Sequence, residues 1–198
     1  MPIIKRKKPL PDIINRVELI KLLHTPKIMK HRIMFALAYG SGLRIGELCN
    51  VKLADIDIVT KTIHVRNTKN GYDRIVPICA DFIRGLQSYL LQSQIDVYLF
   101  PGRHKDKPIS ISAVQHALCS ARRKAGITKK ITMHNLRHSY ATHFIEDTGD
   151  LLRLKKYLGH RDIKNTMRYL KTAQEIPQGK PYSPLSRVFD IARKSLNQ

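Results

Sequence analysis

Apolar residues recur at the spacing of an α-helix from Arg16 onward. A longer apolar stretch, 28–39, predicts a buried helix that ends at Gly40, because glycine commonly terminates helices. A short helix over 45–50 is expected next. Residues 1–15, in front of these helices, are basic and contain prolines, which is typical of a flexible arm.

The hydrophobic period changes from helical to two-residue alternation in the segment 56–79. Apolar and polar residues alternate through 62–66 and again after Asn70-Gly71, a pair that is typical of a β-hairpin turn. We therefore predict a three-stranded antiparallel sheet in this segment. Lys69 is expected in the turn between its second and third strands.

Helical spacing returns beyond the sheet and continues towards the C-terminus. The predicted helices cover 82–91, 114–121, 134–147, 150–157, 162–171 and 185–196. Asp162 is placed to act as the N-cap of the helix that follows it. Together the elements predict a mixed, mainly α fold, with helices around a small three-stranded antiparallel β-sheet.

The same pattern divides the chain into a basic flexible arm, 1–15, one domain, 16–176, and a C-terminal tail, 177–198. The tail carries an amphipathic helix whose apolar residues share one face. These residues are Leu185, Val188, Phe189, Ala192 and Leu196. A loop with glycine and prolines precedes the helix, so we expect it to be separable from the domain.

The charge balance is strongly basic. The 198 residues include 36 Lys and Arg against 15 Asp and Glu, which gives a formal net charge of +21 and a pI of about 10.2. Such an excess concentrates a polyanion, either nucleic acid or an anionic membrane, near the surface. No run approaches the ~18 apolar residues of a membrane span, and no apolar signal region follows the first lysines, so we predict neither a membrane span nor secretion.

Cysteine usage points to a reducing compartment. Cys49, Cys79 and Cys119 are odd in number, widely spaced and set among apolar residues. This pattern gives neither a disulfide framework nor the spacing of a zinc site. We therefore expect a cytoplasmic protein.

Cleavage of a nucleic-acid phosphodiester without a metal requires a nucleophile, cations that stabilise a pentavalent phosphorane, and an acid for the leaving oxygen. The sequence contains no P-loop, no paired-carboxylate metal site and no Ser-His-Asp order. Arginine is the best phosphate clamp, because its planar fork donates two parallel hydrogen bonds and stays charged. The remaining candidates are therefore tyrosine, arginine, histidine and lysine side chains.

Three short motifs follow one another along the chain. The run SGLRIGEL covers 41–48, HNLRHSYATH covers 134–143, and LGH covers 158–160, with a tyrosine nine residues farther on. Together with the hairpin lysine, these motifs resemble the tyrosine recombinases, which include phage integrases and chromosome-dimer resolvases, over residues 16–172. The positions that match the family's site residues are Arg44, Lys69, His134, Arg137, His160 and Tyr169.

The resemblance implies the family's catalytic-domain fold and a division of roles. Arg44 and Arg137 would bind the nonbridging phosphate oxygens, while His134 and His160 would add hydrogen bonds and transfer protons. His134 and Arg137, three residues apart on one helix, share a face and can reach the same phosphate. Glu47, one turn after Arg44, fits an orienting or structural partner better than a base.

The resemblance also implies covalent chemistry. Tyr169 would attack the phosphorus to give a 3′-phosphotyrosine, and Lys69 would protonate the leaving 5′ hydroxyl. Because the ester conserves the bond energy, a second 5′ hydroxyl can reverse the step, so no cofactor, metal or ATP is expected. Of the other tyrosines, Tyr140 and Tyr157 occur in apolar helical patterns typical of a core, and Tyr182 lies beyond the motifs.

A metal site built from histidines is an alternative for this region. His134 and His138 have the i, i+4 spacing of a zinc pair, and His143 is a further candidate. No glutamate follows His134, no other ligand is clearly placed, and Arg137 between the histidines would repel a cation. We therefore assign no metal ligands.

The resemblance implies site-specific recombination or integration of double-stranded DNA by a homo-oligomer, a tetramer on paired sites. Accessory DNA-bending proteins and a cytoplasmic location at the nucleoid are expected with it. Two alternatives stay open: a type IB topoisomerase-like monomer that nicks and closes DNA, and a DNA-binding regulator without strand exchange. The presence of Tyr169, Arg44 and Arg137 argues against the regulator.

The two ends of the chain raise separate questions: the N-terminal arm is shorter than in most relatives, and the C-terminal helix could dock in two ways. Relatives usually carry a helical domain before the first arginine motif, whereas here only a short arm precedes it. The chain is either a truncated piece or a short natural form, similar in size to the fimbrial inversion recombinases. In relatives the segment after the nucleophile docks into a neighbouring protomer, which predicts the same exchange for the tail helix. Packing of that helix in cis is the alternative.

Overall fold

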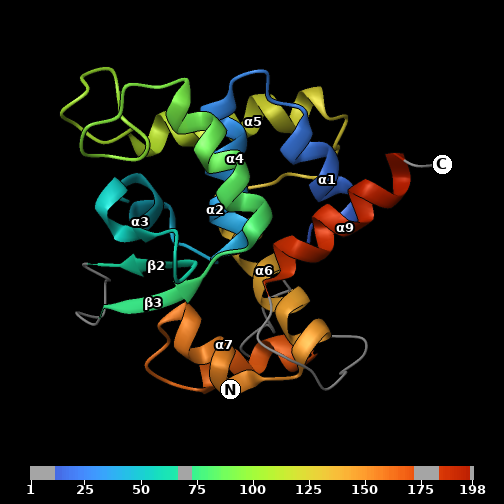
Figure 1. Ribbon diagram of the computed structural model, residues 1–198. Helices are drawn as coiled ribbons and strands as arrows, with labels where there is room; N and C mark the ends of the chain where they lie inside the picture. Colours follow the sequence, from blue (N-terminus) through green and yellow to red (C-terminus); the bar gives the residue numbers. More distant parts are fainter. Residues whose placement is uncertain (1–11, 67–72, 172–182, 197–198) are drawn as a thin grey trace, which may run out of the picture.

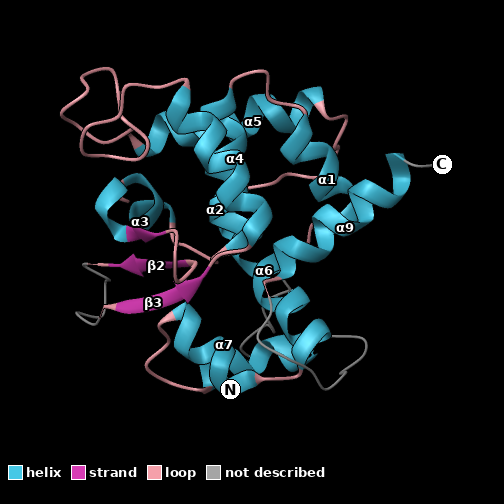
Figure 2. Cartoon of the chain, viewed as in Figure 1, coloured by secondary structure: helices cyan, strands magenta, loops and turns pink. Residues whose placement is uncertain are grey.

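The computed structural model describes residues 12–66, 73–171 and 183–196. Helices make up most of the protein, and one small sheet lies at their side (Figure 1). The elements are α1 (Arg16–His24), α2 (Met29–Gly40), α3 (Ile45–Cys49), the 3-10 helix η1 (Leu53–Asp55), β1 (Ile56–Asp57), β2 (Thr62–Val65), β3 (Arg74–Pro77), α4 (Ala80–Leu91), α5 (Ile111–Lys124), α6 (Met133–Thr148), α7 (Leu151–Leu158), α8 (Lys164–Met167), the 3-10 helix η2 (Arg168–Lys171) and α9 (Pro184–Leu196). The predicted mixed, mainly α fold is confirmed (Figure 2).

The sheet has the order β1-β2-β3, and both neighbouring pairs of strands are antiparallel, as predicted. Ile63 of β2 pairs with Val76 of β3. These two residues and Val65 are buried, whereas Ile75, one residue out of phase, is exposed. One face of the sheet is therefore covered by the rest of the protein. Lys69 and its predicted turn lie outside the described residues.

Helices α2 and α6 form the centre of the molecule. Every residue of α2 from Ile33 to Gly40 is buried, and α2 packs against both α4 and α6. Helix α6 is buried along most of its length although it contains histidines, an arginine and hydroxyl residues. Ser139 shows how a buried polar group of this helix finds partners: its hydroxyl donates to the Asn135 carbonyl at 2.8 Å and accepts from the Ile14 amide at 2.9 Å. Helix α6 thus brings chemically active side chains inside the fold.

The turn after α7 depends on a glycine. Asp150 caps the start of α7 by accepting a hydrogen bond from the Arg153 amide at 2.8 Å. Gly159 ends the helix with φ at +63°, a conformation that favours glycine. A Cβ added to Gly159 would lie 3.3 Å from Cδ of Arg74. The glycine therefore lets α7 approach β3 closely and places His160 beside that strand.

The predicted helix around Tyr169 is shorter and tighter than expected. Helix α8 ends after one turn, has Ile163 at its N-cap, and is followed by η2. The predicted N-cap role of Asp162 is therefore wrong, although its Oδ1 accepts a hydrogen bond from the Lys164 amide at 2.8 Å. A helix with about three residues per turn aligns positions three apart. Thr166 and Tyr169 accordingly share a face, and both are buried.

Helix α9 packs on its own domain, against α1, α2, α4 and α6. Leu185 and Val188 are buried, and a Cβ added to Gly40 of α2 would lie 2.8 Å from Cδ2 of Leu185. Arg187 forms an ion pair with Asp147 of α6. Within the single chain α9 thus takes the cis arrangement, and its exchange with a neighbouring protomer stays a prediction. The last residue of the predicted stripe has no described side chain.

Replacing Val188 with Asp should destabilise the isolated chain, because the carboxylate would lose its water between α9 and the domain. The midpoint of thermal unfolding should fall by on the order of 10 °C, equivalent to ~3 kcal/mol or more. Ser195→Asp, at an exposed position of the same helix, should leave the midpoint nearly unchanged. Equal midpoints for Val188→Asp and the wild-type monomer would show that α9 is not held in cis in solution.

Candidate active site

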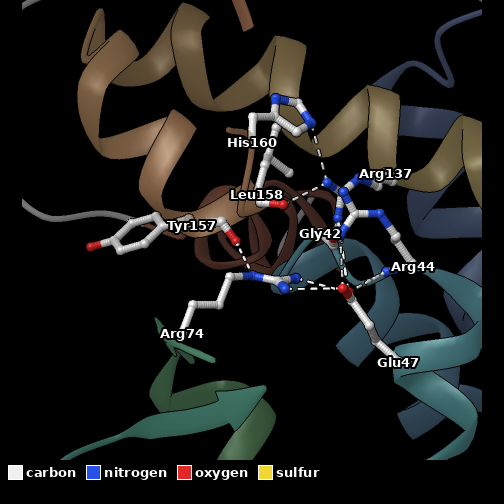
Figure 3. A network of polar contacts seen from close by, with 8 residues as sticks. All are labelled: Gly42, Arg44, Glu47, Arg74, Arg137, Tyr157, Leu158 and His160. Atoms are coloured by element: carbon white, nitrogen blue, oxygen red, sulfur yellow. Dashed lines mark hydrogen bonds and ion pairs between the residues drawn. The ribbon is translucent and has the colours of Figure 1, made fainter. Parts of the chain in front are cut away.

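The structure brings five of the six site residues predicted from the sequence together around Arg137 of α6. Arg44 precedes α3, Arg137 lies on α6, and His160 follows α7 (Figure 3). His134 lies one turn before Arg137 on α6, and Tyr169 lies in η2, which packs on α6. The sixth, the hairpin lysine, is outside the described residues.

Arg137 is 3% exposed, and backbone carbonyls hold its guanidinium in place. Nη1 donates to the Gly42 carbonyl at 2.5 Å, and Nη2 donates to the Leu158 carbonyl at 2.7 Å. Burial, followed by the nearby charge of Arg44, lowers the pKa of Arg137 to about 10. The guanidinium therefore remains charged at neutral pH and forms a fixed cation in the site.

Glu47 lies between the arginines (Figure 3). Its carboxylate accepts hydrogen bonds from the backbone amide of Arg44 at 2.8 Å and from Nη1 of Arg44 at 2.9 Å. Nη1 of Arg137 is 4.0 Å from the same carboxylate. Burial alone would raise the pKa of Glu47, but the hydrogen bonds and charge of Arg74, with Arg44 and Arg137, lower it to about 2. Glu47 is thus an ionised orienting partner, as the sequence predicted.

Arg74 of β3 belongs to the same network but is not among the site residues predicted from the sequence. Its Nη1 and Nη2 donate to the two carboxylate oxygens of Glu47 at 3.0 and 2.8 Å, and its Nε donates to the Tyr157 carbonyl at 2.6 Å. Arg74 therefore connects β3 with α3 and α7. The alternation of side chains along the strand could have indicated this role. Arg74 is two residues before Val76 and points to the same buried face, where a charged side chain needs a partner.

His160 is held in one tautomer. Its Nε2 lies 3.3 Å from Nη2 of Arg137, which can only donate, so Nε2 accepts and the ring proton is on Nδ1, 3.0 Å from the Thr166 hydroxyl. Burial, helped by the surrounding arginines with Arg137 first, lowers the pKa of His160 to about 3. His160 is therefore neutral at physiological pH and helps to fix the position of Arg137.

Tyr169 is 3% exposed, and its hydroxyl lies 2.8 Å from Nδ1 of His138. Burial raises the pKa of Tyr169, while the charges of Arg137, Arg168 and Arg44 act in the opposite direction. The hydroxyl thus lies within the electric field of both predicted phosphate clamps. From the sequence His138 is a candidate metal ligand only, and its contact with the predicted nucleophile emerges from the fold.

The competing tyrosines occupy the positions expected of them. Tyr140 is fully inside the core, and Tyr157 is partly buried against it. The core role predicted for Tyr140 is confirmed, whereas Tyr157 lies at the edge of the core. Tyr182 lies outside the part of the chain that the structure describes.

The histidines considered as metal ligands have other partners. The exposed His134 has its ring centroid 4.1 Å from that of His138, which contacts the predicted nucleophile. His143 has its Nδ1 2.8 Å from the Tyr39 hydroxyl. Among residues 12–66, 73–171 and 183–196, no group of three or more His, Cys, Asp or Glu side chains could hold a metal ion. The histidine metal site therefore gains no support from this region.

Comparison with known sequences agrees with the resemblance. The model of the phage integrase family matches residues 13–175. Tyrosine recombinase XerA of Thermococcus onnurineus is 37% identical over 176 residues, which cover 86% of this chain and 62% of the relative. Tyrosine recombinase XerD of Staphylococcus saprophyticus is 35% identical over 177 residues, which cover 83% of this chain and 59% of the relative. The chain thus spans about three fifths of the length of these curated relatives.

Solved structures share the fold. The crystal structure of XerA recombinase superposes with a TM-score of 0.74 and 28% identity, covering 97% of this chain and 67% of that one. XerH recombinase, in a post-cleavage complex with its palindromic difH substrate, also gives a TM-score of 0.74, at 20% identity and with 96% of this chain and 54% of that one covered. The second match supports the fold alone.

Replacing Arg74 with Gln should lower the free energy of unfolding by ~3 kcal/mol or more, because Glu47 stays buried with fewer donors. Removing the carboxylate as well, in Arg74→Gln/Glu47→Gln, should recover part of this loss, so that the two changes are not additive. Urea denaturation at pH 7 measures both effects. Arg66→Gln, which breaks a more exposed pair with Asp55 beside the same sheet, should cost less. Strictly additive losses would show that Arg74 and Glu47 do not act as a pair.

Proposed function

The chain belongs to the phage integrase family, and from this membership and the geometry of the site we propose that it cleaves and rejoins DNA strands through a 3′-phosphotyrosine link formed by Tyr169. The observation that carries the proposal is the burial of Tyr169 within the field of Arg137 and Arg44. A nucleophile beside fixed cations is what displacement at a phosphodiester requires. The proposed activity is that of a site-specific recombinase or integrase.

In this proposal the scissile phosphate binds between Arg44 and Arg137. The side chain of Arg44 is 30% exposed and is held at its Nη1 by Glu47, so its other N–H groups can donate to phosphate oxygens. Arg137 is already fixed by backbone carbonyls. Cations that are in place before the substrate arrives stabilise the phosphorane without reorganisation. His134 is proposed to add a hydrogen bond to the same phosphate, and His160 to act through Arg137, since its Nε2 faces Arg137 and its Nδ1 faces the Thr166 hydroxyl.

The chemical cycle needs no external energy. The Tyr169 oxygen attacks the phosphorus, the 5′ oxygen leaves, and Lys69 is proposed to donate the proton that this oxygen takes up. The phosphotyrosine ester retains the energy of the broken bond, so a 5′ hydroxyl from the same or another strand can reverse the step. Recombination results when the attacking strand is a different one.

Double-stranded DNA is the proposed partner, and the net charge of +21 supports it because neutralised phosphates release counterions. We further propose a homo-oligomer, a tetramer on paired sites, with accessory DNA-bending proteins and a cytoplasmic location at the nucleoid. In the ranges that the structure describes, no helix combines the length and apolar character needed to cross a membrane.

Tyr169→Phe should abolish covalent attachment to a duplex nicked near its cleavage point and leave DNA affinity little changed, because only one hydroxyl is lost. A denaturing gel detects the adduct, and a binding titration measures the affinity. Tyr157→Phe is the matched control and should keep the adduct, since the contact of Tyr157 with Arg74 uses its backbone carbonyl. A detergent-resistant adduct formed by the Tyr169→Phe variant would assign the nucleophile to another residue.

Adduct formation should proceed at the same rate in excess EDTA, because arginines supply the positive charge that a metal ion would otherwise provide. The rate is measured on the nicked duplex with and without the chelator. A magnesium-dependent endonuclease in the same buffer shows that chelation is complete. Cleavage that EDTA stops and zinc or magnesium restores would contradict the proposed mechanism.

A further inference from the structure

Helix α6 carries two buried histidines with the same contact. Nδ1 of His138 lies 2.8 Å from the Tyr169 hydroxyl, and Nδ1 of His143 lies 2.8 Å from the Tyr39 hydroxyl. Only the first pair contains the proposed nucleophile. We propose that His138 is the catalytic base that takes the proton of Tyr169 during cleavage and returns it during rejoining, an inference that rests on the proposed function.

The hydrogen bond between the two side chains has a chemically preferred direction. A neutral imidazole nitrogen is a better acceptor than a phenolic oxygen, and a phenol is a good donor. The Tyr169 hydroxyl therefore donates to Nδ1 of His138, and the ring proton of His138 is on Nε2. A base needs this arrangement, because its lone pair already faces the proton that it removes.

The protonation state of His138 is suited to accepting a proton. The groups that face it are His134 and Arg137 on α6, and Arg168 and Tyr169 on η2. Burial, followed by the charges of His134, Arg168 and Arg137, lowers the pKa of His138 to about 4. His138 is therefore unprotonated at neutral pH, and it becomes protonated, and unable to act as a base, as the pH falls towards 4.

Bound DNA would favour the proton transfer. In the free protein the neighbouring arginines oppose a positive charge on His138, as they oppose it on the other buried histidines. A phosphate bound at Arg137 brings a negative charge that offsets this repulsion and stabilises the imidazolium. The base is thus weak before the substrate binds and stronger when a phosphate is in place.

The step balances in both directions. In cleavage, the Tyr169 oxygen forms a bond to phosphorus, the bond from phosphorus to the 5′ oxygen breaks, and the tyrosine proton moves to Nδ1 of His138. The 5′ oxygen takes its proton from Lys69. In rejoining, the 5′ hydroxyl returns its proton to Lys69 and attacks, and the leaving Tyr169 oxygen takes the proton back from His138.

This inference changes the role expected for His134. The resemblance assigns proton transfer to His134 and His160, yet Nδ1 of His138 lies at hydrogen-bond distance from the Tyr169 hydroxyl. His134 is exposed at the start of α6, and His160 contacts Arg137 and Thr166. The position of His134 fits hydrogen bonding to the phosphate, and that of His160 fits orientation of Arg137.

Single-turnover cleavage of the nicked duplex tests the proposal. His138→Asn should slow cleavage by about 100-fold or more at pH 7 while leaving the Kd for DNA nearly unchanged. The decline of the wild-type rate at acidic pH should disappear in this variant. Its rate should instead rise towards alkaline pH, where Tyr169 loses its proton to solvent.

The matched control is His143→Asn, which removes the same contact with Tyr39. It should lower thermal stability as His138→Asn does, but leave the rate per folded molecule and its pH profile unchanged. A second control distinguishes the role of His138 as the base from that of Lys69 as the acid. It uses a duplex with sulfur in place of the 5′ bridging oxygen, whose leaving group needs no proton. This duplex should restore cleavage by Lys69→Ala but not by His138→Asn.

Two results would overturn the assignment. The first is cleavage by His138→Asn, or by His138→Gln if the Asn variant does not fold, at a rate close to that of His143→Asn. The second needs no variant: nitrogen-15 NMR of the wild-type protein should place the ring proton of His138 on Nε2, and a proton on Nδ1 would rule out its action as a base. Absence of any adduct with wild-type protein would instead contradict the proposed function.

Discussion

One buried carboxylate, that of Glu47, holds the proposed phosphate site together. Three arginines reach it from different parts of the chain: Arg44 from the start of α3, Arg74 from β3 and Arg137 from α6. Without a counter-charge these guanidiniums would repel one another in a region largely shielded from water. One carboxylate among three guanidiniums leaves the cluster net positive. The elements can therefore pack closely and still present positive charge to a phosphodiester.

The arginines and the buried histidines have complementary electrostatic roles. Burial lowers the pKa of His138 to about 4 and that of His160 to about 3, whereas Arg137 keeps a pKa of about 10. Permanent charge at neutral pH therefore belongs to the arginines, and the histidines remain available as neutral acceptors. Burial lowers the pKa of both residue types, but arginine starts from so high a value that it stays charged, whereas histidine becomes neutral.

Most of the fold could be predicted because helical and alternating spacing are local properties of the sequence. The candidate site could also be predicted, since its residues belong to short motifs in a fixed order. Which residues meet across the fold could not. Arg74 is a single charge on a short strand, 27 residues from Glu47, and His138 is 31 residues from Tyr169. The cis packing of α9 likewise depends on the surface that its apolar stripe meets, which the stripe does not specify.

The left-handed turn at Gly159 makes this position sensitive to mutation, although it carries no reactive group. The residue has no side chain and takes no part in the chemistry, yet any Cβ there would press against Arg74. Arg74 holds both Glu47 and the Tyr157 carbonyl, so a displacement would pass to the phosphate clamps without loss of any functional group. A genetic screen for defective strand exchange would then recover Gly159 together with the arginines, although an inventory of reactive side chains would omit it.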